Sequence, residues 1–229
     1  RATRADAKAL KVAVPMLPRI ANFDDLDPLK AEDQVEVLMV PPGQPLPHDA
    51  GLVVIPGTKS TIADLIAFRE NGWERDLQAH VRRGGHVLGI CGGFQMLGNR
   101  ISDPHGIEGQ VREIDGLGLL DVETIMEPEK IVRNVAAHSM LYDAALEGYE
   151  IHIGRTHGPD TNRPFSKIDC HDDGAVSRDG RIMGTYLHGV FCADEFRRKL
   201  LRDLGIISTI KDYKINIEMA LDELASDLE

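Results

Sequence analysis

The sequence predicts an α/β fold: an open, mostly parallel, twisted sheet with helices on both faces and antiparallel strands added in its second half. Short apolar runs recur in the first ninety residues, at 12–15, 35–40, 52–55 and 86–90. Segments with helical spacing separate the later runs, and beyond residue 119 strand-like runs follow one another without such segments between them. This alternation of strand and helix is typical of βα units around a buried parallel sheet.

Two helices are expected between the third and fourth apolar runs. Helical spacing covers residues 61–70 and 73–83. In the second of these segments Leu77 and Val81 lie four residues apart, and Gly84-Gly85 follows as a helix stop. The third and fourth strands are therefore expected to be joined by a helical crossover, as parallel neighbours require.

The second half of the chain is expected to add strands before a last helix. Strand-like runs occur at 119–126, 131–138, 149–153, 175–177 and 181–187. The segment Ser177-Arg178-Asp179-Gly180 is a hairpin-turn candidate because of its Asp-Gly pair. Helices are expected over 194–204 and, with acidic residues on the opposite face, over 216–228.

Composition places the chain among ordinary globular proteins. Of its 229 residues 42% are hydrophobic and 28% charged, which excludes a wholly disordered chain. No apolar run approaches the ~18 residues of a membrane span, and the N-terminus lacks an apolar signal core. A cytoplasmic location without a membrane partner is therefore expected. The net charge of −11 argues against a nucleic-acid partner, because phosphate binding needs a basic surface.

The cysteines are Cys91, Cys170 and Cys192, an odd number without a CxxC spacing. Neither a disulfide framework nor a thiolate zinc site is indicated, and no metal site is expected. At least one thiol is therefore free, and its neighbours decide whether it carries chemistry.

The surroundings of Cys91 indicate a nucleophile. An apolar strand at 86–90 runs into a cysteine between glycines and then into a helix, which is the layout of a nucleophile elbow. The helix dipole would favour a thiolate there, and the N–H of Gly92 would point to a developing oxyanion. The alternative is an inert buried cysteine in a tight turn.

A second glycine-containing turn supports the interpretation of Cys91 as a nucleophile. The strand at 52–55 ends in Pro56-Gly57-Thr58-Lys59-Ser60-Thr61, and free N–H groups of such a turn could add a second oxyanion donor. The Thr-Lys-Ser-Thr string lacks the glycine spacing of a phosphate-binding P-loop. ATP binding by this loop is therefore not expected.

A thiolate nucleophile needs a base, and His188 is the best-placed of nine histidines. His188 lies at the end of a strand-like run at 182–187, and active sites of α/β folds are found at such strand ends. The alternative is a histidine with only a structural role. Within 148–154, Glu150 and His152 project to one face of an expected strand. That face meets either solvent or a cleft, and a cleft would suit hydrogen bonding to a polar ligand.

Several motifs, in order along the chain, carry a resemblance to a known family. The run Gly-Ile-Cys-Gly-Gly-Phe-Gln-Met-Leu at 89–97 resembles the G-x-C-x-G-x-Q-x-L nucleophile motif of class I, triad-type glutamine amidotransferases. Residues 14–29, 54–61, 148–154 and 186–189 resemble the glutaminase half of the cobyric acid synthase family, and the likeness covers about residues 11–205. The resemblance implies a class I glutamine amidotransferase fold, which is flavodoxin-like.

The resemblance also implies roles for individual residues. Cys91 would attack the side-chain amide of glutamine, releasing ammonia and leaving a glutamyl thioester, and His188 would move the protons. Backbone groups at Gly57 and Gly92 would hold the oxyanion, and Gln95 would help to position the substrate. No cofactor is expected in this domain.

A partner domain is implied as well. The ammonia would pass to an ATP-dependent synthetase domain of the same polypeptide, which would use ATP and Mg²⁺ to amidate carboxylates of the corrinoid acceptor adenosylcobyrinic acid a,c-diamide. Residues 1–10, polar and Ala-rich, are interpreted as a linker from that N-terminal domain. Residues 11–205 are then the amidotransferase domain, and 206–229 a C-terminal helical extension.

One position departs from the wider class. Most triad amidotransferases have His-x-Glu, whereas Val190 stands two residues after His188, as in the cobyric acid synthase branch. The chain thus offers a Cys–His dyad, and the third catalytic residue stays open. Glu150, with His152 beside it, is the candidate that either orients His188 or binds the amino group of the substrate.

Two other functions remain open at this point. The chain could be the glutaminase subunit of a lipid II-amidating complex, which shares the dyad pattern. It could also be a non-catalytic docking or regulatory module that has kept its motifs. The stretch Pro-Arg-Ile-Ala-Asn-Phe-Asp-Asp at 18–25 favours the cobalamin branch over the first of these.

Overall fold

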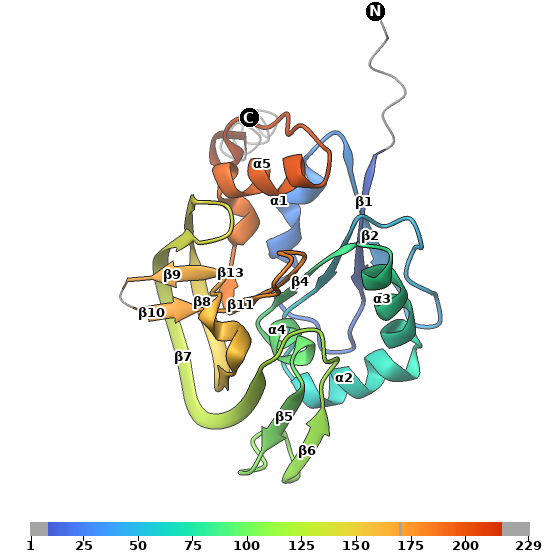
Figure 1. Cartoon of the computed structure of the whole chain (residues 1–229), viewed down its shortest axis with the longest axis vertical. Coiled ribbons are helices and arrows are strands. Elements are labelled where there is room, and N and C mark those ends of the chain that lie inside the picture. The colour runs from blue at the N-terminus through green and yellow to red at the C-terminus, as the bar shows by residue number, and fades with distance from the viewer. Residues whose placement is uncertain (1–8, 170, 217–229) are drawn as a thin grey trace, which may run out of the picture.

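The computed structural model describes residues 9–169 and 171–216, which fold around two sheets (Figure 1). In the described part of the chain the first sheet has the strand order β11-β12-β4-β3-β1-β2. Its strands are β1 (Leu10–Pro15), β2 (Val35–Val40), β3 (Leu52–Ile55), β4 (His86–Ile90), β11 (Ala175–Val176) and β12 (Ile182–Thr185). All neighbours pair in parallel except β11 and β12, so the expected open, mostly parallel sheet is confirmed.

Helices cover both faces of this sheet. The helices are α1 (Asp27–Lys30), α2 (Thr61–Glu70), α3 (Trp73–Arg82), α4 (Gly92–Leu97) and α5 (Asp194–Asp203). In β3, Val53 and Ile55 pack with α2, α3 and α4, whereas Leu52 and Val54 pack with α1 and α5. Successive strand residues point to opposite faces, so a fully apolar strand forms two separate cores.

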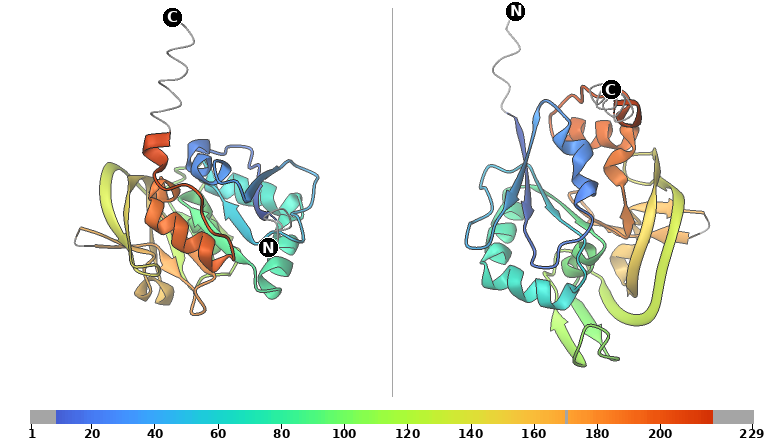
Figure 2. Two further views of the ribbon diagram at one scale, coloured as in Figure 1. Left: turned by 90° about the horizontal axis from the view of Figure 1, so that it is seen from above. Right: turned by 180° about the vertical axis from the view of Figure 1, so that it is seen from behind.

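The second sheet is built on one long hairpin. It contains β5 (Arg100–Asp103), β6 (Arg112–Asp115), β7 (Glu123–Ser139), β8 (Ala144–His157), β9 (Ser166–Ile168), β10 (His171–Asp173) and β13 (Leu187–His188). In both views of Figure 2 the β7–β8 hairpin lies to one side of the parallel sheet. The chain leaves the first sheet at β12 and pairs with β8 at β13, so residues 185–187 cross from one sheet to the other.

The prediction for the second half needs correction. Only residues 123–126 of the strand expected at 119–126 are in a strand, and they belong with 131–138 to the single strand β7. The pairing of β7 with β8 shifts register between Ile125 and Lys130. The short strands β5, β6, β9 and β10 were not predicted, because sequences such as REID and HDD lack an apolar period. The hairpin at Ser177–Gly180 is confirmed, but only β11 adds an antiparallel strand to the first sheet.

Local turns complete the described chain. Within residues 9–169 and 171–216 there are three short 3-10 helices, η1 (Phe23–Leu26), η2 (Pro159–Asn162) and η3 (Val190–Cys192). Residues 1–8, 170 and 217–229 lie outside the described part, and with them most of the expected linker and terminal helix; Leu10 already belongs to β1. None of the helices in the described ranges is long and apolar enough to cross a membrane.

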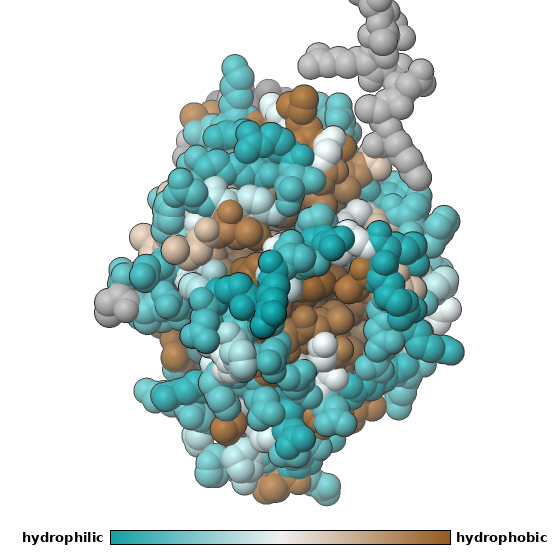
Figure 3. All heavy atoms as spheres, viewed as in Figure 1, coloured by the Kyte–Doolittle hydropathy of each residue, from teal (hydrophilic) through white to brown (hydrophobic). Residues whose placement is uncertain are grey.

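Hydrophilic side chains predominate on the face of the molecule that Figure 3 shows, and hydrophobic side chains gather near the middle of that face.

A buried ion pair joins the helices on one face of the sheet. Arg197 of α5 is fully buried, and its Nε donates to Glu32 at 2.8 Å. The same carboxylate accepts hydrogen bonds from Ser208 Oγ at 2.6 Å and from Thr209 N at 3.0 Å. Glu32 therefore connects the segment after α1 with α5 and with the chain that follows α5.

Replacement of Glu32 by Gln tests this connection. The change removes one of the two carboxylates, Glu32 and Asp194, that pair with the buried guanidinium of Arg197. We therefore expect the free energy of unfolding to fall by about 2 kcal/mol in urea denaturation. Asp27→Asn is the matched control, because Asp27 pairs with Lys30 in an exposed position, where loss of an ion pair costs below about 1 kcal/mol. Equal effects of the two changes would contradict the assigned role of Glu32.

Candidate active site

Cys91 stands at a strained turn between β4 and α4. Its φ of 54° and ψ of −111° lie in a region that residues other than glycine rarely adopt. A Cβ on Gly93 would lie 2.0 Å from the carbonyl oxygen of Ile55, and one on Gly89 would lie 2.6 Å from the carbonyl oxygen of Gly93. The flanking glycines therefore allow the close approach of α4 to β3 and β4 that the turn requires, as expected of a nucleophile elbow.

His188 is held beside Cys91 by a carboxylate that the sequence analysis did not select. The imidazole is completely buried, and its Nδ1 donates to Asp25 Oδ2 at 2.7 Å. The other oxygen of Asp25 accepts the N–H of Gly189, also at 2.7 Å. Asp25 thus fixes both the ring and the backbone that follows it, and it supplies the carboxylate that Val190 cannot.

The same contacts set the charge of His188. Burial lowers the pKa of the imidazole, but hydrogen bonds with Asp25 and Cys91, together with their negative charges, outweigh burial and raise it to about 10. The contacts with Asp25 and Cys91 therefore favour the protonated form of the imidazole. An imidazole held between a carboxylate and a thiol is suited to take a proton from the sulfur and to return it, because the carboxylate stabilises the imidazolium formed in between.

Gly57 and Gly92 both lie at this point, as expected. A Cβ on Gly57 would lie 3.0 Å from His188 Cε1 and 3.7 Å from Cys91 Cβ. A Cβ on Gly92 would lie 2.5 Å from the side chain of Thr58. A side chain at Gly57 would therefore press on His188, and one at Gly92 would press on Thr58.

Gln95 lies in α4, one turn after Cys91, and its amide is fully engaged. Its Oε1 accepts from Thr61 Oγ1 at 2.9 Å, and its Nε2 donates to Ile153 O at 2.8 Å and to Tyr186 Oη at 3.2 Å. It therefore ties α2, β8 and the crossover segment together. In this structure Gln95 shapes the wall of the site.

A cavity of about 390 Å³ opens in front of Cys91. Gly57, Gln95 and His152 contribute to its lining, and three charged residues, Lys59, Glu108 and Lys130, do so as well. The S–H of Cys91 donates to Ile151 O at 3.1 Å, so β8 forms the opposite wall. The cavity is mixed in polarity and of a size that suits a small polar molecule.

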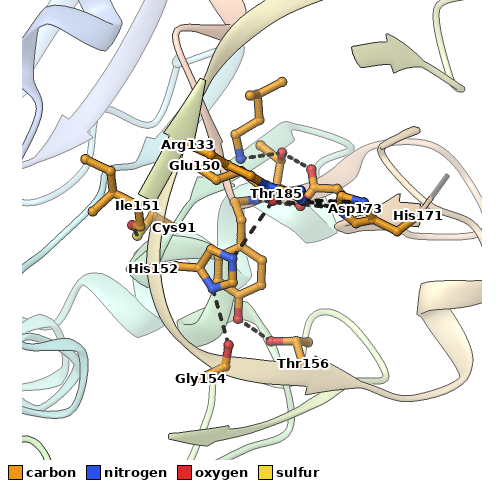
Figure 4. Close-up of polar contacts among 12 residues, drawn as sticks. Cys91, Arg133, Glu150, Ile151, His152, Gly154, Thr156, His171, Asp173 and Thr185 are labelled. Atoms are coloured by element: carbon orange, nitrogen blue, oxygen red, sulfur yellow. Dashed lines mark hydrogen bonds and ion pairs between the residues drawn. The ribbon is translucent and has the colours of Figure 1, made fainter. Parts of the chain in front are cut away.

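Glu150 does not orient His188. Tyr149, its neighbour in β8, lies opposite His188 in the strand register and stacks on the imidazole with ring centroids 5.1 Å apart. Adjacent strand residues point to opposite faces, so Glu150 points away and instead contacts Arg133 Nε at 2.6 Å (Figure 4). It lines a separate, larger cavity of about 490 Å³ that does not include Cys91.

His152 lies between the two cavities and lines both. Its ring stacks on Tyr186 with centroids 3.8 Å apart, and its Nδ1 lies 3.2 Å from Gly154 O. Burial lowers the pKa of His152, so the ring favours the neutral form. Among the residues that the structure describes, no group of three His, Cys, Asp or Glu side chains is arranged to hold a metal ion.

Asp25 carried only an indirect signal in the sequence. It belongs to the segment 14–29 on which part of the resemblance rests, but it lies in η1, 163 residues from His188. No local pattern connects residues so far apart. The contact depends on the packing of η1 against the turn after β13.

A family model and curated proteins match this chain. Residues 11–196 match the model of the CobB/CobQ-like glutamine amidotransferase domain. The whole chain is 74% identical to part of the cobyric acid synthase of Brucella canis, and 72% identical to part of that of Brucella anthropi. The chain spans only 47% of the length of these relatives.

Solved structures share the fold at low sequence identity. The structure of PurLQS from Thermotoga maritima matches with a TM-score of 0.66 and 18% identity, covering 86% of this chain and 99% of that one. A crystal structure of a glutamine amidotransferase matches with a TM-score of 0.56 and 16% identity, covering 85% and 99%. The expected fold class is confirmed. Because the family model covers most of the chain, the protein belongs to the CobB/CobQ-like glutamine amidotransferase domain family.

Proposed function

We propose that this chain hydrolyses glutamine and supplies the ammonia for amidation of adenosylcobyrinic acid a,c-diamide in cobalamin biosynthesis. The observation that carries the hydrolytic part is the strained Cys91, with His188 and Asp25 behind it and a cavity in front. The choice of acceptor rests on the 74% identity to a cobyric acid synthase. An ATP-dependent synthetase domain of the same polypeptide, with its ATP and Mg²⁺, would perform the amidation.

The reaction begins when Cys91 passes its thiol proton to His188 and the sulfur attacks the side-chain amide carbon of glutamine. The resulting tetrahedral intermediate carries a negative oxygen, which the N–H groups of Gly57 and Gly92 would stabilise. His188 donates its proton to the leaving nitrogen, so ammonia departs and a glutamyl thioester remains. His188 then takes a proton from water, which attacks the thioester. Collapse of the second tetrahedral intermediate releases glutamate and the Cys91 sulfur, to which His188 returns the proton.

Asp25 would act by holding His188 through this cycle. Its carboxylate keeps Nδ1 protonated and leaves Nε2 for proton transfer with the sulfur and the substrate. Gln95 would position the substrate indirectly, because its amide already holds Thr61 and Ile153 in the wall of the cavity.

Charges around the cavity suit a free amino acid. Glu108 could receive the α-ammonium group, and Lys59 or Lys130 the α-carboxylate. Both oxygens of Glu108 already accept N–H groups at the start of α2, at 2.8 Å from Thr61 and 2.9 Å from Ile62, so its position is fixed. Because the side chain of Glu108 is already ordered, binding an ammonium group would cost little further side-chain entropy.

Two alternatives predict different behaviour. The glutaminase subunit of a lipid II-amidating complex would hydrolyse glutamine but supply a different acceptor, and no relative named above carries that activity. A non-catalytic docking or regulatory module would not hydrolyse glutamine at all. The strain at Cys91 and the charge of His188 favour catalysis over the second alternative.

Labelling tests the nucleophile. A diazo-ketone analogue of glutamine should modify Cys91 before Cys192, because His188 assists the first thiol whereas burial raises the pKa of the second. Peptide mass mapping after limited reaction measures the order. Equal modification of the two cysteines would remove the main support for Cys91.

Replacement of Cys91 by Ala in the intact protein tests the coupling. Glutamine-dependent amidation of the corrinoid should disappear, while amidation driven by added ammonia should continue, because the synthetase chemistry does not need the thiol. Cys192→Ala is the matched control and should keep both activities. Loss of both activities in a folded Cys91→Ala protein would assign Cys91 to the synthetase reaction instead.

Replacement of Asp25 by Asn tests the orienting role. In the folded protein the pKa of His188 is raised from its ordinary value of 6.5 to about 10. The contact between Asp25 and His188 therefore stabilises the fold fully below pH 6.5, and this stabilisation is lost as the pH rises through about 10. Asp25→Asn should therefore lower the free energy of unfolding by roughly 1–3 kcal/mol near neutrality and by less in strong alkali.

Urea denaturation across this pH range measures the difference, with the exposed Asp24→Asn as control. Asp25→Asn should also reduce kcat for glutamine hydrolysis by about 10²- to 10⁴-fold, with little change in KM. A stability difference that is independent of pH would argue that Asp25 does not hold the charged imidazole.

A further inference from the structure

A second buried carboxylate near the site has no part in the reaction above. Asp173 ends β10 and is 4% exposed. Its Oδ2 accepts from the hydroxyl groups of Ser166, at 3.1 Å, and of Thr185, and its Oδ1 accepts the N–H of Tyr186 at 3.0 Å. Figure 4 shows Asp173 and Thr185 facing each other.

The partners of Asp173 lie in the segment that carries His188. Thr185 ends β12, and residues 185–187 cross to β13, where His188 begins its contacts with Asp25 and Cys91. The Thr185 hydroxyl donates to Asp173 and at the same time accepts the N–H of Leu187 at 3.0 Å. One carboxylate therefore holds all three residues of the crossover, two directly and one through Thr185.

Thr185 also connects the crossover with the nucleophile. Its carbonyl oxygen accepts the N–H of Cys91 at 2.8 Å. The position of Thr185 consequently sets the distance between the backbone of Cys91 and the segment that leads to His188. A shift of Thr185 would move both members of the dyad relative to each other.

Asp173 has only neutral donors in these contacts. Burial raises its pKa to about 6, and the hydrogen bonds from Thr185, Tyr186 and Ser166 counteract part of this rise. A buried carboxylate without a cation costs free energy unless its hydrogen bonds are satisfied. A buried carboxylate with satisfied hydrogen bonds beside an active site is typical of residues that fix the positions of neighbouring groups.

We infer that Asp173 is a positioning residue for the Cys91–His188 pair, acting through Thr185 and the 185–187 crossover. This inference rests on the proposed glutaminase function. It assigns Asp173 no contact with the substrate. The cavity in front of Cys91 does not include Asp173, so substrate binding should be unaffected by its loss.

Asp173→Ala and Thr185→Val in the intact protein test the inference. Thr185→Val keeps the β-branched shape in β12 but removes the bridging hydroxyl, so it should fold even if Asp173→Ala does not. Each change should lower kcat for glutamine hydrolysis about tenfold, with KM for glutamine within about twofold of its original value. Asp172→Asn is the matched control, since Asp172 is the exposed neighbour of Asp173.

The pH dependence of Cys91 alkylation by iodoacetamide is the second measurement, followed in the Cys91 peptide by mass spectrometry. Misplacement of His188 should move the rise of the alkylation rate to higher pH in both variants and leave it unchanged in Asp172→Asn. Loss of thermal stability alone, without a change in this profile or in kcat, would overturn the inference. If Asp173→Ala does not fold, an unchanged Thr185→Val protein overturns it by itself.

The same measurements separate this inference from the proposed function. If the original protein alkylates Cys91 no faster than Cys192 at neutral pH and does not hydrolyse glutamine, the proposed function fails. If the original protein is active and the Thr185→Val protein equals it, only the role of Asp173 fails.

Discussion

The hydrogen bond between Asp25 and His188 is the contact on which the candidate active site depends. It joins η1, near the start of the chain, to the end of the crossover, and the same carboxylate also fixes the N–H of Gly189. Without it a buried imidazole would have no partner for its charge. A short helix outside the sheet thereby decides the protonation of the histidine that faces the nucleophile.

The two sheets contribute different parts of the site. The parallel sheet supplies the turns at its carboxyl edge, with Cys91 after β4 and Gly57 after β3, where α/β folds collect ligands. The second sheet supplies the opposite wall through Ile151 and Ile153 of β8. His188 depends on both sheets, because the chain crosses from one to the other immediately before it.

Three buried polar side chains beside the dyad have hydrogen-bond partners in the structure. Asp25, Gln95 and Asp173 hold the ring, the cavity wall and the crossover respectively. Satisfied networks in a low-dielectric interior are rigid, so the strained backbone of Cys91 is held in place by groups on three different elements.

Local patterns in the sequence were sufficient for the parallel sheet, for the turn at Cys91, for the glycine loop at Gly57 and for the strand end at His188. Each depends on neighbours within a few residues, such as apolar runs, flanking glycines and turn pairs. The partner of His188, the direction of Glu150 and the existence of a second sheet were decided only by the tertiary structure. Asp25 lies 163 residues from His188, and the one-residue alternation of β8 turns Glu150 away from it. Contacts of this kind follow from strand register and from packing between distant segments, which no local period in the sequence encodes.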